Sequence, residues 1–160
     1  MHLSRRTVHS SALKAAVHFT LSICGGCVLC VAQSGCMSKH SNSISSLAHH
    51  INEDADLLHA EYTPSVRELI RRGHCAIPYM LDLMINKDQE TRLRAQTVIE
   101  GITLRDHGWI PGEGWPGPDM EKGYNSFWRS LGNLQFDSDP SARLRSVAMW
   151  RRWYANLSER

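Results

Sequence analysis

The sequence predicts an all-α protein built from short packed helices. Apolar residues recur at three- and four-residue steps in several separate stretches, which is the periodicity of one helical face. Glycine and proline are concentrated in a single long segment, residues 105–124, which predicts a loop between helices. The chain has 160 residues, of which 42% are hydrophobic and 21% charged. These values fit about one globular domain.

The charge distribution argues against a nucleic-acid partner. The formal net charge is +2, and Arg5, Arg6 and Lys14 lie before the first apolar run. The rest of the chain is close to neutral and concentrates no basic charge in any one segment. A nucleic-acid-binding protein usually carries a basic face, so we expect no nucleic-acid partner.

The N-terminal segment 1–35 has the pattern of an export signal. Residues 1–14 are basic and contain no acid, and residues 15–32 are then uncharged and largely apolar. A basic region followed by an apolar run and small residues is typical of a secretory signal. The run is also just long enough to span a bilayer. A retained membrane anchor is therefore the alternative, which His18, Gly25 and Gly26 make less favourable.

The end of this segment, Ala32-Gln33-Ser34-Gly35-Cys36, resembles the lipobox of bacterial lipoproteins. The resemblance implies cleavage before Cys36 and acylation of its thiol. Gln33 departs from the family pattern, which usually has Leu, Val or Ile there. Acyl chains would hold the protein at a membrane. The implied location is the bacterial cell envelope, facing the periplasm or the exterior.

The remaining cysteines suggest no redox or catalytic centre. Cys24, Cys27 and Cys30 have a spacing found in iron–sulfur ligand runs, but their apolar surroundings favour ordinary side chains of a signal. If Cys36 is acylated, Cys75 has no disulfide partner and is expected to be a small buried hydrophobe. His74 beside it would not face it on a helix, so we expect no thiolate pair.

A polar tether and a first helix are expected next. Residues 36–46 are rich in serine, which predicts a flexible tether ahead of a helical domain at 47–160. A helical face begins at Ile44, near the end of the expected tether, and continues to Leu58. Its positions are Ile44, Leu47, Ile51, Ala55 and Leu58.

Histidines on this first helix are candidate metal ligands. His49 and His50 lie four residues before Glu53 and Asp54, and His59 follows. Such pairs can ligate a metal from one side of a helix. A solvated polar face is the alternative. No second cluster completes a coordination sphere, so we expect no metal and no cofactor.

The next helix has a start and a stop signal. Ser65 and Glu68 fit a capping box, in which each side chain meets the other residue's backbone amide. Gly73 can then supply the left-handed position that ends a helix. Between these signals Val66, Leu69 and Ile70 are expected to face inward.

Two further helices predict a hairpin about the turn Asn86-Lys87-Asp88. The first presents Ile77, Met80, Leu81 and Met84, and the second presents Thr91, Ala95, Val98, Ile99 and Ile102. Helices joined by about three residues must lie antiparallel. Asp88 is expected to be the N-cap of the second helix, with Glu90 favourable in its first turn.

The hairpin resembles a HEAT-like repeat of the armadillo type. Gly73 through Leu81 is similar to the first helix of that motif, and Asp88 through Arg92 to the start of the second. The resemblance implies that Asp88 and Arg92 form a turn-stabilising pair. HEAT-like units stack and usually need about three copies. Flanking helices, or another protein, would therefore cover this hairpin, which implies an interaction or scaffold module.

Loop 105–124 is the candidate binding segment. Trp109 and Trp115 could anchor a protein, a peptide or a sugar, or both indoles could pack back as an Ω-loop. Asp106, His107 and Glu113 lie nearby and could assemble an acid–base site. This second interpretation would make the protein an accessory subunit or an envelope enzyme.

The chain is expected to end in a capping helix. A short helix over 125–131 would turn Phe127, Trp128 and Leu131 inward. Asp139 and Pro140 then predict an N-cap and a first helical residue. The apolar face expected is Leu144, Val147, Trp150, Tyr154 and Leu157, with Arg143, Arg145, Arg151 and Arg152 mostly off it.

The cluster Trp150, Trp153 and Tyr154 resembles a tail that closes HEAT-like arrays in bacterial envelope proteins. A basic amphipathic helix on anionic lipid is the alternative. The sequence contains no nucleophile elbow, Walker loop, dinucleotide fingerprint or zinc signature. We therefore expect no catalytic residues and a membrane-anchored protein that works by contact with an unknown protein partner.

Overall fold

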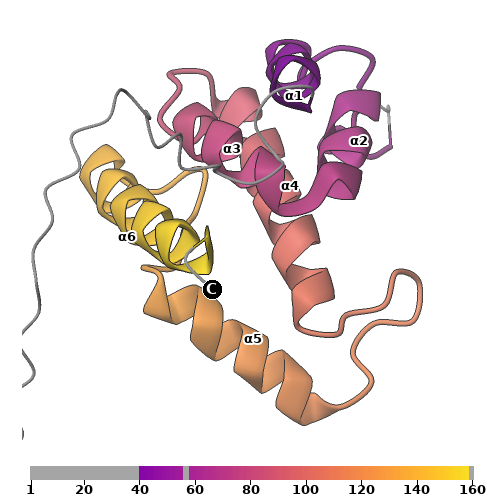
Figure 1. Ribbon diagram of the computed structural model, residues 1–160, viewed down its shortest axis with the longest axis vertical. Helices are drawn as coiled ribbons and strands as arrows, with labels where there is room; N and C mark the ends of the chain where they lie inside the picture. The colour runs from indigo at the N-terminus through magenta and orange to yellow at the C-terminus, as the bar shows by residue number, and fades with distance from the viewer. Residues whose placement is uncertain (1–39, 56–57, 159–160) are drawn as a thin grey trace, which may run out of the picture. The chain divides into compact units, whose positions relative to one another are not determined.

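The computed structural model describes residues 40–55 and 58–158, and this part of the chain is all-α (Figure 1). A single antiparallel bridge, Ile110 to Gly114, is the one β-type pairing in that part. The expected signal and Cys36 lie outside the described residues. The elements are α1 (His40–His49), α2 (Pro64–Arg72), a short 3-10 helix (Gly73–Ala76), α3 (Ile77–Leu83), α4 (Gln89–Asp106), α5 (Pro118–Ser130) and α6 (Pro140–Ser158).

Helices α2, α3 and α4 form an aliphatic core, with α4 packed against both α2 and α3. The inward positions predicted from periodicity are confirmed here. Gly73 ends α2 with a φ of +69°, a conformation that glycine adopts without strain. The fully buried side chains of this core are Val66, Leu69, Ile77, Met80, Leu81, Met84, Ala95, Val98 and Ile99.

The predicted turn between α3 and α4 is present, and its N-cap is confirmed. The Asp88 carboxylate accepts a hydrogen bond from the Thr91 amide at 2.8 Å. Arg92 donates to the carbonyl oxygens of Asn86 and Lys87 at 2.9 and 2.8 Å. Asp88 and Arg92 thus both stabilise the turn, each through its own partners.

The first helix differs from the prediction at both ends. Helix α1 already begins at His40, so residues 40–46, which were assigned to the tether, are helical. It ends at His49, and the chain then turns with Asp54 at a φ of +53°. Ile51 is buried from this turn, whereas Leu58 is 87% exposed. The expected helical face through Leu58 is therefore wrong.

Tertiary hydrogen bonds hold the segment between α1 and α2 against α4. Asn52 donates to the Thr91 hydroxyl at 2.8 Å. The buried Arg94 donates to the Ala60 carbonyl at 3.0 Å and to the Asn52 side chain at 2.6 Å. These bonds hold residues 52 and 60 against α4 within a segment whose described residues are not helical.

The capping box predicted at Ser65 and Glu68 is also wrong. The N-cap of α2 is Thr63, whose hydroxyl accepts from the Val66 amide at 3.1 Å and donates to the Ile51 carbonyl at 2.9 Å. Pro64 occupies the first helical position, which proline favours. Glu68 instead pairs with Arg71 and Arg72.

The glycine- and proline-rich segment is shorter than predicted. Helix α4 continues to Asp106 and α5 begins at Pro118, so the loop spans only residues 107–117. The expectation that residues 105–124 exclude helix is wrong, because Pro118 starts α5 instead of preventing it. The inward positions expected over 125–131 are confirmed for Trp128, which is buried, and for the half-buried Phe127 and Leu131.

Helix α6 packs against α5 through a cluster of aromatic side chains. Trp150 is fully buried. The centroid of its ring lies 4.9 Å from the ring centroid of Trp128, 5.6 Å from that of Phe127 and 5.2 Å from that of Trp153. The start of α6 is as predicted, since the Asp139 carboxylate accepts from the amides of residues 141 and 142. Helix α6 also packs against α3.

Two positions of the predicted α6 face are wrong. Leu144 was expected inside and is 55% exposed, while Arg143 was expected outside and is 8% exposed. Helical geometry determines which residues share a face. Which faces are covered depends on neighbouring segments, and here the segment before α6 covers Arg143, whose guanidinium donates to the Ser138 carbonyl.

Candidate functional site

The two tryptophans of the loop have different surroundings. Trp115 packs against the core, with its ring 5.5 Å from that of Tyr124. Burial of the Tyr124 hydroxyl raises its pKa above the usual range. Both tryptophans are half-buried, but Trp109 is not among the described side chains that pack on the core. The packed Ω-loop interpretation therefore describes Trp115, and Trp109 is the tryptophan better placed for contact with another molecule.

Two exposed apolar residues lie close to Trp109 in the loop: Ile110 follows it in the chain, and Met120 lies against Gly108, which precedes it. Ile110 is 41% exposed and Met120, near the start of α5, is 47% exposed. A side chain at Gly108 would approach the Met120 sulfur at 3.2 Å, so this part of the loop and α5 are in contact. We call Trp109, Ile110 and Met120 the Trp109 face. The sequence pattern indicated Trp109, but it contained no signal for Met120, which the turn into α5 brings close.

The residues proposed as an acid–base site have separate partners. Asp106 bonds to His74 at 2.7 Å. His107 bonds through its Nδ1 to the Thr103 carbonyl at 2.8 Å and its ring packs on Phe127 at 4.6 Å. Glu113 is exposed on the loop. The described contacts therefore do not join the three side chains into one constellation.

His74 and Asp106 form a hydrogen bond at the edge of a pocket of about 170 Å³ between α2 and α4. Both side chains are more than a third exposed. Cys75, next to His74, is half-buried and disulfide-bonded. The expectation that Cys75 lacks a disulfide partner is therefore wrong. The chain's other four cysteines lie outside the described residues.

The histidines near α1 make local contacts. His50 bonds to Glu53 at 2.7 Å, three residues away, in place of the predicted pairing with Asp54. His49 packs edge-on against His50 at 5.0 Å, and His59 is exposed. Across residues 40–55 and 58–158, no group of three or more His, Cys, Asp or Glu side chains could hold a metal ion.

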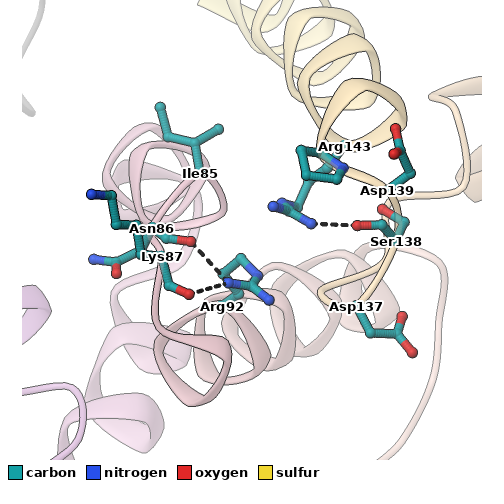
Figure 2. A pocket seen from close by; sticks show the side chains of 9 residues that line it. Ile85, Asn86, Lys87, Arg92, Asp137, Ser138, Asp139 and Arg143 are labelled. Carbon is teal, nitrogen blue, oxygen red and sulfur yellow. Dashed lines mark hydrogen bonds between the residues drawn. The ribbon is translucent and has the colours of Figure 1, made fainter.

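A larger pocket, of about 560 Å³, lies between the α3–α4 turn and the start of α6 (Figure 2). It is lined by residues 85–87, Arg92, residues 137–140 and Arg143, and we call it the arginine pocket. Burial, and then the nearby charge of Arg92, lower the pKa of Arg143. Sequence reasoning missed this pocket because the two arginines are 51 positions apart and each resembles an ordinary surface residue of its helix.

Comparison of the chain with known protein families, curated proteins and solved structures finds no match. Within the described residues, no helix combines the length and apolar character that crossing a membrane requires.

Proposed function

We propose that the protein is an exported lipoprotein of the cell envelope and that its HEAT-like helical domain binds another protein. Three features support this proposal. Residues 1–36 have the pattern of a lipoprotein signal. Cys75 is disulfide-bonded, which supports export, because disulfides are common in oxidising compartments and rare in the cytosol. The Trp109 face offers an apolar contact surface.

The exposure of the Trp109 face is the observation that carries the binding proposal. Tryptophan and methionine are enriched at protein interfaces, and methionine adapts its shape to different partners. Here Ile110 and Met120 remain 41% and 47% exposed beside a loop that otherwise packs on the core through Trp115. A partner with an apolar segment could bury these side chains together.

A photo-crosslinking experiment tests this surface in the native cell. A photoreactive amino acid at Ile110 should capture a discrete partner, and Trp109→Ala in the same chain should reduce that product. The matched control places the crosslinker at exposed Ala155 on α6. Equal capture from both positions, or no effect of Trp109→Ala, would contradict the proposal.

Membrane attachment through Cys36 is tested separately. Metabolic labelling with a clickable fatty acid should mark the wild-type chain and not Cys36→Ala. The Cys75→Ala variant is the informative control. A mature chain that begins at Cys36 contains only Cys36 and Cys75, and a disulfide between them would occupy the sulfur that lipid requires. If Cys36 is lipidated, Cys75→Ala and wild type should be labelled equally. Labelling that appears only in Cys75→Ala would show that in wild type the Cys36 sulfur forms a disulfide with Cys75 and carries no lipid.

A further inference from the structure

The arginine pocket places two guanidinium groups on one open surface. Arg92 projects from α4 and Arg143 from α6, and Figure 2 shows both groups directed into the space between the α3–α4 turn and residues 137–139. Lys87, from the turn, lines the same pocket and is exposed. Three cationic side chains from three segments therefore line the pocket, and Figure 2 shows the Lys87 side chain directed away from the two guanidinium groups.

Arg143 is buried without satisfying its donors. The residue is 8% exposed, and its Nη1 donates to the Ser138 carbonyl. Its Nε is buried and has no hydrogen-bond partner. Buried polar groups are nearly always paired, and buried cations are normally matched by an anion. Within the described part of the chain, Arg143 therefore lacks a hydrogen-bond partner for its Nε and a salt-bridge partner for its charge.

Arg92 is held in place by neutral acceptors alone. Its Nε donates to the Phe136 carbonyl at 2.7 Å, and its Nη1 donates to the two turn carbonyls described above. These bonds orient the guanidinium but leave its charge without a carboxylate. Among the described residues, neither Arg92 nor Arg143 forms a salt bridge.

Neither of the two carboxylates that line the pocket forms a salt bridge with these arginines, although the charge of Asp139 acts on Arg143 and partly offsets the effect of its burial. The Asp139 carboxylate accepts from the Ser141 amide and hydroxyl at 2.8 and 2.6 Å, so it serves as the N-cap of α6. Figure 2 shows Asp137 directed away from both guanidinium groups. The pocket consequently retains positive charge beside the N-terminus of α6, where the helix dipole also favours an anion.

We propose that the arginine pocket binds a phosphate group between Arg92 and Arg143, with Lys87 at its rim. Guanidinium groups match the oxygens of phosphate with paired hydrogen bonds. A phosphate group can present different oxygens to donors on opposite walls at once, whereas a carboxylate presents two oxygens in one plane. The group could belong to a soluble phosphate ester or to a lipid headgroup, since the recognising chemistry is the same.

Calorimetric titration of the purified full chain with inorganic phosphate, at constant ionic strength set by chloride, tests the proposal. Wild type should bind, and Arg143→Met should bind at least tenfold more weakly. Arg145→Met is the matched control, because Arg145 is an exposed arginine two positions along α6 whose contact is with Ser141. No binding by wild type, or equal losses in both variants, would overturn the proposal.

A second variant protects the test against misfolding. Lys87 is exposed on the turn, so Lys87→Met should fold normally, as circular dichroism would show, and weaken phosphate binding severalfold. Unchanged affinity in both Lys87→Met and a folded Arg143→Met would also overturn the proposal.

Vesicles identify the source of the phosphate group. Wild type and Arg143→Met are compared on vesicles of phosphatidic acid and of phosphatidylcholine. A loss of binding in Arg143→Met that is confined to phosphatidic acid supports a lipid headgroup. No difference between the chains on either vesicle, combined with binding of inorganic phosphate, supports a soluble phosphate ester.

Discussion

The aliphatic core of α2, α3 and α4 and the aromatic cluster of α5 and α6 are held together in different ways. In the first, contiguous helices bury small branched side chains around α4, and hydrogen bonds at the turn fix the geometry. In the second, a few large rings meet edge to face around Trp150. We therefore expect the stability of the aliphatic region to be shared among many similar contacts, and that of the aromatic region to depend mainly on Trp150.

Replacement of Trp150 should have the largest effect. Trp150→Ala removes the ring shared by three aromatic neighbours and should lower the free energy of unfolding by about 4 kcal/mol. Trp150→Phe is the matched control. It keeps an aromatic ring and removes an indole Nε1 that is buried without a partner, so its cost should be roughly half as large. Urea denaturation measures both, and equal losses would show that the ring contacts do not dominate.

A single truncation in the aliphatic core should cost less. Leu81 is fully buried on α3, and Leu81→Ala should lower the free energy of unfolding by about 3 kcal/mol. Ile85, four residues later, is 46% exposed, and Ile85→Ala should change it by less than ~0.5 kcal/mol. If Leu81→Ala proved as costly as Trp150→Ala, the contrast between the two regions would fail.

The corrected N-cap of α2 gives a smaller effect. Thr63→Ala removes both the cap and the bond to the Ile51 carbonyl, and should cost about 2 kcal/mol. Ser65→Ala should cost less than ~0.5 kcal/mol, because the capping hydroxyl belongs to Thr63. Thermal unfolding of the two variants distinguishes them. A greater loss of stability for Ser65→Ala than for Thr63→Ala would instead support the capping box predicted from the sequence.

Acid should weaken the aliphatic region through Glu68. Hydrogen bonds from Arg71, and then from Arg72, lower the pKa of Glu68 to about 2. A carboxylate whose pKa is depressed on folding stabilises the protein above its unfolded pKa of about 4.3. That contribution should disappear as the pH falls from about 4.5 to 2. Glu68→Gln should therefore show a smaller fall in melting temperature over this interval, whereas exposed Glu121→Gln should behave as wild type.

Sequence patterns predicted the core well because its determinants are local. The spacing of Ile77, Leu81 and Val98 assigned them to helical faces, and Asp88 was recognised as an N-cap from its position after a short turn. Each of these features depends on residues within one or two helical turns, where backbone geometry relates sequence separation to position in space.

The candidate sites were less predictable because they depend on distant segments. Trp109 could be named from its loop, but the exposure of Met120 follows from where α5 begins. The arginine pocket forms because Arg92 on α4 and Arg143 on α6 line the same space, although loop 107–117 and helix α5 separate them in the sequence. No local pattern in the sequence indicates that meeting.

The sequence alone determined where most helices lie and which residues share a face, because a helix repeats every 3.6 residues whatever surrounds it. Tertiary structure decided where α1 stops, which residue caps α2, and that Arg143 is covered while Leu144 faces solvent. Burial is a property of two surfaces in contact, and a single helix's sequence describes only one of them.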